Sequence, residues 1–289
     1  MNHRPRRHPV RRVFLILLAA ALFAVFLHWS NHSLQTTRFD IPLADLPAGF
    51  DGTRITVLGD THGAVFGENN EHLFSAVADT DPEYIFLLGD LEDSNRGPTP
   101  GYAESMAAGL SAIAPTYYVT GNHEWAIGHT SELKERLRQN GVHVLSNQFV
   151  PLERGGDQLV LAGIDDPNGY ADQKTPEALA AELYAAWGDP FWILLAHRNN
   201  FFAERYSLLG ADLVLSGHSH GGVIRLPFLG GLIDHDRRLF CHYSAGLYRE
   251  NGSTLFVTRG IGNSGISRRL FNRPEIAVLT LHKASEPFT

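Results

Sequence analysis

Five polar clusters in this sequence carry side chains that bind cations or transfer protons. Their ligand-capable groups are carboxylates, an amide and imidazoles, at Asp60, His62, Asp90, Asn122, His197, His218 and His220, with His123 beside Asn122. Oxygen and imidazole donors without thiolate suit Mn, Fe, Zn or Mg rather than Cu(I) or an iron–sulfur cluster. Cys241 is the only cysteine, which excludes a cysteine-based zinc site and an intramolecular disulfide.

The number of these groups predicts a site for two ions. Eight groups exceed what a single tetrahedral ion needs. Two divalent ions about 3.5–4 Å apart, bridged by a carboxylate and a water, would use them and would convert the water into a hydroxide nucleophile at neutral pH. Phosphate esters are the natural target, because two cations can neutralise the charge of an in-line displacement.

A short, β-rich apolar run precedes each cluster and predicts the element that positions it. The five runs are Arg54–Leu58, Tyr84–Leu88, Thr116–Val119, Phe191–Leu195 and Asp212–Leu215. Continuous apolar runs of this length are typical of strands buried on both faces. Since ligands gather at the carboxyl ends of strands in α/β folds, we expect all five clusters at one edge of a sheet.

Helical patterns lie between several of these strands, and alternation of strands with helices predicts an α/β fold. The expected helices are Glu71–Ala78, Ala103–Ile113, Ser131–Gln139, a stretch from Thr175 to Trp187, and Phe201–Leu209. Three later segments are expected as strands of a second sheet behind the first, at Leu239–Ser244, Thr254–Thr258 and Ile276–Leu281.

Taken in order, the clusters resemble the motif set of the calcineurin-like metallophosphoesterases. The matching blocks are Asp60-Thr61-His62, Gly89–Asp93, Gly121–Glu124, His197 and Gly217–His220, and together they cover about Ile55–Gly222. The resemblance implies a four-layer α/β/β/α sandwich of two packed mixed sheets flanked by helices, over residues 53–284. Two departures from the family pattern remove no ligand: Arg198-Asn199 replace the usual residues after the fourth-block histidine, and Gly59 stands where Ser is frequent.

Further stretches resemble a membrane-anchored bacterial branch of the family. They are Gly217–Gly222 with Ile224–Pro227, Gly246-Leu247-Tyr248, Arg259–Gly262 and Arg273–Ile276. That branch includes YaeI/YkuE-type phosphodiesterases and pyrophosphatases acting on UDP-diacylglucosamine. The resemblance therefore implies a phosphoric ester or anhydride hydrolase, with mono- or diester and pyrophosphate cleavage all left open.

The resemblance also implies a role for each matching residue. Asp60, His62 and His220 would hold one metal, Asn122, His197 and His218 the second, and Asp90 would bridge them. His123 would contact the phosphate and protonate the leaving oxygen, a role that suits a histidine near neutral pH. Glu124 and Asp93 would orient histidines.

The N-terminus has the pattern of a membrane signal or anchor. Val13–Leu27 is an unbroken run of 15 apolar residues preceded by five arginines. We expect an uncleaved single-pass anchor over residues 1–30, because Trp29 suits the membrane interface and the following residues offer a poor cleavage site. A cleaved signal peptide and a buried soluble helix are the alternatives. Residues 31–52 are expected to be a connector and the start of the domain.

The charge distribution predicts the location and excludes one class of partner. Six arginines and no acid precede Asp40, and the remainder carries 18 basic and 31 acidic residues, a net charge of −13. An acidic body is unsuited to binding a nucleic-acid backbone. The N-terminal arginines favour a cytoplasmic N-terminus, with the catalytic domain on the extracytoplasmic side of the cell membrane.

Two function classes compete at this point. A hydrolase acting on a phosphorylated small molecule or a lipid head group is favoured, because no ligand of the set is missing. The alternative is a catalytically silent, membrane-tethered scaffold that binds metal. A metallo-β-lactamase-like hydrolase is disfavoured, because its compact His-x-His-x-Asp-His run does not occur in the sequence.

Overall fold

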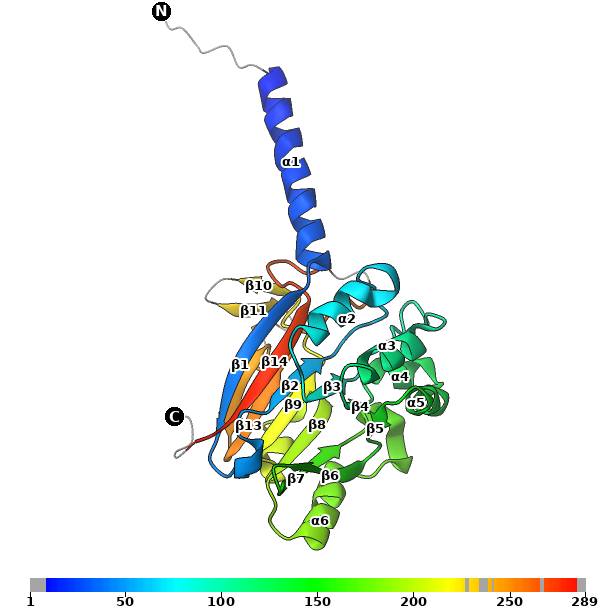
Figure 1. Ribbon diagram of the computed structural model, residues 1–289. Helices are drawn as coiled ribbons and strands as arrows, with labels where there is room; N and C mark the ends of the chain where they lie inside the picture. The colour runs from blue at the N-terminus through cyan, green and yellow to red at the C-terminus, as the bar shows by residue number, and fades with distance from the viewer. Residues whose placement is uncertain (1–8, 227–228, 234–238, 241, 266–267, 285–289) are drawn as a thin grey trace, which may run out of the picture.

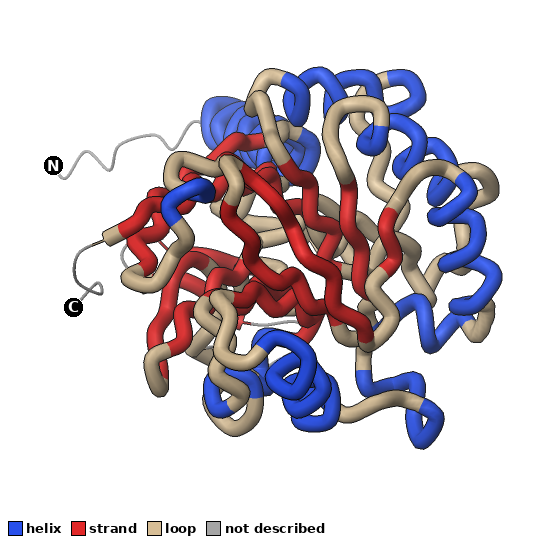
Figure 2. Tube along the Cα trace, turned by 60° about the horizontal axis from the view of Figure 1, so that its bottom comes forward, coloured by secondary structure: helices blue, strands red, loops and turns tan. Residues whose placement is uncertain are grey.

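Two six-stranded mixed sheets pack face to face and are flanked by helices, as the computed structural model shows (Figures 1 and 2). The structure describes residues 9–226, 229–233, 239–240, 242–265 and 268–284. The expected fold class, a four-layer α/β sandwich, is therefore confirmed.

The first sheet joins the beginning, the middle and the end of the chain. Its strand order is β1 (Gln35–Leu43), β14 (Glu275–Lys283), β2 (Arg54–Leu58), β3 (Tyr84–Leu88), β4 (Thr116–Val119) and β5 (His143–Val144). Only the contact between β14 and β2 is antiparallel. β1 lies within the segment that was expected to be a connector and the start of the domain.

The second sheet combines a parallel centre with an antiparallel hairpin at each edge. Its order is β12 (Gly246–Glu250), β13 (Ser253–Val257), β9 (Leu213–Gly217), β8 (Trp192–Arg198), β7 (Asp157–Gly163) and β6 (Gln148–Arg154). A separate two-stranded ribbon, β10 (Ile224–Leu226) and β11 (Gly230–Ile233), follows β9 in the chain.

Helices cover the outer face of each sheet, and apolar side chains fill the space between the layers. The helices are α2 (Glu71–Ala78), α3 (Tyr102–Ser111), α4 (Asn122–Ile127), α5 (Thr130–Gln139) and α6 (Pro176–Trp187). Buried residues of α2, α3 and α5 pack on the first sheet, and those of α6 pack on the second. Thr175 caps α6 by accepting a hydrogen bond from the Ala178 N–H at 3.2 Å, as its sequence predicts.

The five strands expected to carry the site divide between the two sheets. β2, β3 and β4 belong to the first sheet, whereas β8 and β9 belong to the second. Ile276–Leu281, expected in the second sheet, lies in β14 of the first. Both sheets are covered on both faces, so an apolar run fits either one and its pattern does not identify its sheet.

Two expected elements are wrong. Phe201–Leu209 is not an α-helix but contains short 3₁₀ turns, η4 (Asn199–Phe201) and η5 (Tyr206–Leu208). Leu239–Ser244 does not form a strand in its described residues; Cys241 lies outside them. Two backbone carbonyls of this segment accept hydrogen bonds from side chains instead of from a neighbouring strand. Asn199 donates to the Tyr243 carbonyl, and Ser219 donates to the Ser244 carbonyl.

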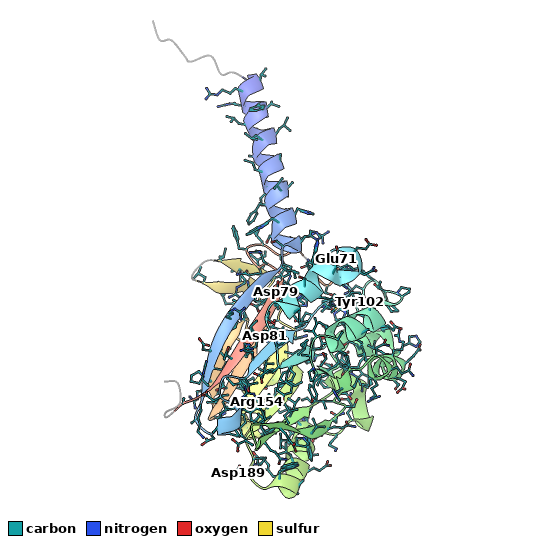
Figure 3. All side chains as sticks on the ribbon, viewed as in Figure 1. Glu71, Asp79, Asp81, Tyr102, Arg154 and Asp189 are labelled. Carbon is teal, nitrogen blue, oxygen red and sulfur yellow. The ribbon has the colours of Figure 1, made fainter. Side chains whose placement is uncertain are left out.

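The N-terminal helix α1 (Pro9–His32) extends away from the domain (Figure 1). Over Val10–His32 it is long and apolar enough to cross a membrane, by length and composition. Figure 3 shows the side chains along most of its length standing out on all sides, away from the rest of the domain. The buried-helix alternative is therefore wrong for α1.

Phe256 in β13 tests the packing between the sheets. It is fully buried, and its ring centroid lies 4.9 Å from that of Phe39 in β1. Phe256→Ala leaves a cavity, so we expect the free energy of unfolding of the full chain in detergent micelles to fall by about 3–5 kcal/mol. Leu208→Ala, at a residue 65% exposed, serves as the control. Urea unfolding measures both, and equal midpoints for the two variants would contradict the assignment of Phe256 to the core.

Candidate metal centre and its acid

The structure brings all eight residues singled out in the sequence into one buried site at the carboxyl ends of strands from both sheets. Asp60 and His62 follow β2, Asp90 follows β3, and Asn122 and His123 begin α4 after β4. His197 lies in β8, and His218 and His220 follow β9. The site therefore lies where the edges of the two sheets meet, rather than at the edge of one.

One group of four donors surrounds a point between β2 and β9. Asp60, His62, Asp90 and His220 each offer a ligand atom, and these atoms lie within 4.8 Å of one another. The Nε2 atoms of His62 and His220 are 3.0 Å apart, and Nε2 of His62 is 3.7 Å from Oδ2 of Asp90. Several buried lone pairs that point toward one another are suited to bind a cation between them.

A second group shares Asp90 with the first. Asp90, His197 and His218 offer ligand atoms within 4.8 Å of one another. Nε2 of His197 lies 3.3 Å from Oδ2 of Asp90, 3.2 Å from Nδ1 of His218 and 3.1 Å from Oδ1 of Asn122. Nδ1 of His197 lies 2.7 Å from the Leu88 carbonyl and donates its proton there, which turns Nε2 toward the other donors.

The electrostatics of the site show its demand for positive charge. Burial opposes a charge on His197, but the carboxylate of Asp90, its hydrogen bond and Asp60 raise the pKa of His197 to about 10. Burial raises the pKa of Asp60 to about 7. Burial lowers the pKa of His62 to about 3. The carboxylates thus draw a proton onto one imidazole, and divalent cations would meet the same demand.

The backbone at the ligands is held in an unusual conformation. Five of the seven proposed ligands have positive φ angles, namely Asp60 (50°), His62 (46°), Asp90 (51°), His218 (69°) and His220 (50°). Left-handed backbone at non-glycine residues costs of order 1–3 kcal/mol each and is concentrated at functional sites. Gly121 makes room for this geometry, because a Cβ there would meet Oδ1 of Asp90 at 2.2 Å.

His123 lies beside both metal groups with its two ring nitrogens in different surroundings. The Ser94 N–H donates to Nδ1 at 2.9 Å, so the neutral imidazole carries its proton on Nε2. Nε2 lies 4.0 Å from Oδ2 of Asp90. Asp93, expected to orient a histidine, does lie beside the ring, with Oδ1 3.3 Å from Nδ1.

Glu124 does not orient a histidine, contrary to expectation. Its carboxylate accepts four backbone N–H bonds instead, from Asp90, Leu91, Glu92 and Gly121, at 2.6–3.2 Å. It therefore binds the backbone turn that carries Asp90 to the start of α4. The sequence could not show this, because Glu124 follows His123 directly and the Asp90 turn lies in another block.

The sequence patterns did not predict three further residues at the site. The hydroxyl groups of Ser94 and Ser264 lie within hydrogen-bond distance of the His123 ring, and Ser264 belongs to the loop after β13. Arg269 is buried, and its guanidinium donates to the carbonyls of Arg259 and Gly262 close to Asp60. Serine and arginine in loops carry no periodic pattern, so only the folded chain reveals them.

Arg198-Asn199, the positions that depart from the family pattern, are engaged within the protein. Nε of Arg198 donates to Asp166 at 2.7 Å, and Asn199 donates to the Tyr243 carbonyl at 2.6 Å. Arg259 also pairs within the protein, with Nε 2.7 Å from Oε1 of Glu275.

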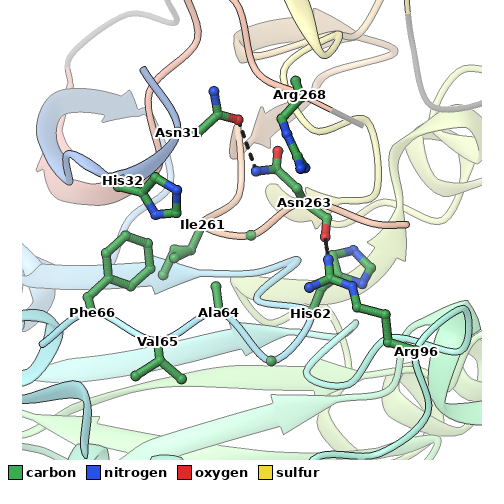
Figure 4. Close-up of a pocket in the computed structure, with 12 residues that line it drawn as sticks. Asn31, His32, His62, Ala64, Val65, Phe66, Arg96, Ile261, Asn263 and Arg268 are labelled. Carbon is green, nitrogen blue, oxygen red and sulfur yellow. Dashed lines mark hydrogen bonds between the residues drawn. The ribbon is translucent and has the colours of Figure 1, made fainter. Parts of the chain in front are cut away.

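A pocket of about 420 Å³ opens beside the metal groups on the side where α1 leaves the domain (Figure 4). Its lining includes His62, the α1 residues Asn31 and His32, the apolar Val65, Phe66 and Ile261, and the polar Arg96, Asn263 and Arg268. Arg96 pairs with Asp93 at 2.9 Å. His62 belongs to both the pocket lining and the first metal group, so it lies between the two.

Comparison with known proteins identifies the class. The family model for calcineurin-like phosphoesterases matches residues 53–222. A transmembrane protein with a metallophosphoesterase domain from Danio rerio is 30% identical over 95% of this chain and 63% of its own length. The metallophosphoesterase YkuE of Bacillus subtilis is 27% identical over 97% and 99%, and the phosphodiesterase YaeI of Escherichia coli is 32% identical over 69% and 70%.

The chain belongs to the calcineurin-like phosphoesterase family and is a metal-dependent phosphoric ester hydrolase. It spans just under two thirds of the length of the Danio rerio relative, which is named as a transmembrane protein. Together with the apolar helix α1, the names of such relatives suggest a membrane anchor.

Glu124→Gln tests how the Asp90 turn is held. The amide would turn an NH₂ toward two backbone N–H donors, each of which then costs about 1–3 kcal/mol when left unpaired. We expect weaker metal binding and a lower melting temperature, measured by metal titration and thermal unfolding. Glu132→Gln, at an exposed position of α5, is the matched control. Metal affinity equal to that of the control would exclude this role of Glu124.

Proposed function

We propose that the protein is a membrane-anchored phosphohydrolase with two divalent metal ions, acting on a phosphoester or pyrophosphate bond of a lipid head group. The observation that carries the two-metal proposal is that Asp90 belongs to both donor groups. Asp60, His62 and His220 would complete one ion's ligands, and Asn122, His197 and His218 the other's. The ions, when bound, would activate a water and neutralise charge on the phosphoryl group.

His123 would act as the general acid. Because Nδ1 accepts the Ser94 N–H, the neutral ring presents its proton on Nε2, on the side of Asp90. A leaving alkoxide or phosphate oxygen beside the metal groups would receive that proton. Asp93, 3.3 Å from Nδ1, would favour the return of a proton to the ring after each turnover.

The position of the pocket supports a lipid-linked substrate. Its lining combines the end of α1 with His62 of the metal group, so a phosphate held at the membrane surface would have a short path to the site. Arg268 and Arg96 would attract an anionic head group, and the apolar Val65 and Phe66 suit the part nearest the acyl chains. We place the N-terminus in the cytoplasm and the domain on the other side, following the N-terminal arginines.

The first test is metal-dependent hydrolysis by the full chain in detergent micelles. The protein is stripped with chelator and assayed on bis(p-nitrophenyl) phosphate and p-nitrophenyl phosphate, with Mn, Fe, Zn or Mg added back and bound metal counted. We expect two ions per chain and restored hydrolysis. Two bound ions without turnover of these or phospholipid substrates would favour the scaffold alternative, and one ion or none would exclude the two-metal centre.

Asp90→Asn tests the shared ligand. Loss of the charge that serves both groups is expected to reduce metal-dependent turnover to the background rate and to lower the number of bound ions. Asp189→Asn is the control, because Asp189 is exposed and lies beside α6, far from the pocket (Figure 3). Near-normal turnover in Asp90→Asn would contradict the bridging role.

His123→Ala tests the general acid. Metal content is expected to stay at the wild-type level, and hydrolysis of esters with poor leaving groups is expected to fall by about 10²–10⁴-fold. Esters with good leaving groups need little proton donation and should lose far less. His129→Ala, at an exposed position after α4, is the control. The same loss across a leaving-group series would show that His123 does not donate the proton.

A further inference from the structure

Four large apolar side chains stand exposed close to the base of α1. They are Leu229 (69% exposed), Leu239 (63%), Phe240 (66%) and Phe271 (53%). We call these four residues the apolar rim. Exposed apolar residues that stand singly need no explanation, but a group of them marks an interaction surface.

The apolar rim belongs to one structural unit around the β10–β11 ribbon. Leu229 immediately precedes β11, and the Phe240 N–H donates to the Leu232 carbonyl at 3.0 Å. Leu239 bridges to Ile233 of β11, and Leu270, next to Phe271, bridges to Ile224 of β10. Figure 1 shows this ribbon beside the base of α1.

The contact between Phe271 and α1 gives the level of Phe271 along the helix. The ring centroids of Phe271 and Phe26 are 5.1 Å apart. Phe26 lies within the apolar run, which ends at Leu27, and Trp29 follows as an interface residue. A side chain packed on Phe26 therefore lies at the level of the last apolar turn of the helix.

The direction in which α1 leaves the domain is also fixed. The Arg273 guanidinium lies 4.7 Å from the centre of the Trp29 ring, and it donates to the Ser33 hydroxyl at 2.7 Å. The Asn31 side chain exchanges hydrogen bonds with the backbone of Arg269, at 3.0 and 2.8 Å. Arg269 and Arg273 lie two residues before and two residues after Phe271, so contacts on both sides hold Phe271 against the helix.

We propose that the apolar rim inserts into the interfacial layer of the bilayer that α1 crosses, as a second membrane contact of the domain. The bilayer is the occupant indicated by the rim's continuity with the apolar run of α1. Burying exposed leucine and phenylalanine there is favourable. The inference rests on the proposed membrane insertion of α1, but not on hydrolysis. Its consequence is that the pocket, whose walls include Asn31 and His32, opens at head-group level.

The test measures the depth of spin labels on the full chain in vesicles of phosphatidylethanolamine and phosphatidylglycerol. In a Cys241→Ser background, single labels replace Leu229 or Phe240 in the rim, Leu208 or Trp187 as exposed controls, and Leu17 within α1. We expect rim and Leu17 labels to collide more with oxygen than with a polar nickel complex. Labels at Leu208 and Trp187 are expected to show the opposite.

Three results would overturn the proposal. Rim labels as accessible to the nickel complex as the control labels would show that the rim stays in water. Rim labels shielded from both reagents, with dipolar broadening between copies, would show that a second chain covers the rim. An aqueous Leu17 label would overturn the anchor itself, and so the proposed function would fail at a separate, identifiable step.

A paired substitution tests whether the rim acts as a unit. Leu229→Ser with Phe240→Ser is expected to shift a label at Leu239 several-fold toward the aqueous accessibility ratio. Leu208→Ser with Trp187→Ser, which removes a comparable exposed apolar area elsewhere, should leave that label unchanged. An unchanged Leu239 label in the rim variant would overturn the proposal. Wild-type hydrolysis of bis(p-nitrophenyl) phosphate by both variants verifies that the domain is folded.

Discussion

The buried donor atoms around Asp90 require positive charge among them, and the rest of the structure depends on this constraint. Its Oδ2 lies 3.3 Å from Nε2 of His197 and 3.7 Å from Nε2 of His62, all of them buried. Lone pairs so close together repel unless positive charge lies among them. The protein keeps them there by left-handed backbone at five of the proposed ligands, by the glycine that faces Asp90, and by the Glu124 carboxylate that binds the Asp90 turn. Two sheets, rather than one, supply the strands whose ends meet at this point.

The sequence predicted the membership of this site but not the means by which it is held. Each ligand follows or ends a buried apolar strand, and such a strand is visible as a run of four or five apolar residues. Which sheet a strand joins depends on long-range hydrogen bonds, and both sheets accept the same pattern, so β8, β9 and β14 could not be assigned. The role of Glu124 was missed for a related reason, since its partners are backbone groups of a distant turn. The edge strands β6 and β12 are half exposed, and their apolar pattern is weak.

Residues of the loop after β13 contact both the end of α1 and the candidate metal site. Asn31, at the end of α1, hydrogen-bonds to Arg269, and earlier in the same loop the Gly262 N–H donates to the Asp60 carbonyl at 2.7 Å. Between them, the Gly265 N–H donates to Asp93, the carboxylate beside the His123 ring. Gly262, Gly265 and Arg269 therefore contact, in turn, the proposed metal ligand Asp60, the carboxylate beside His123 and the end of α1. The end of α1 and the candidate site are thus connected through one loop, as the proposal of a site close to a membrane requires.

The parallel pairing of β1 with β14 has a consequence for how the chain is made. β1 is the first strand after α1, yet its register partner is the last strand, with Gln35 opposite Glu275. Contacts between such distant parts of a chain form slowly, and domains fold as units once their residues are available. During synthesis α1 is complete long before β14 leaves the ribosome, so the first sheet lacks the strand between β1 and β2. The first sheet can therefore close only after β14 has been synthesised, whatever has already folded around β2 to β5.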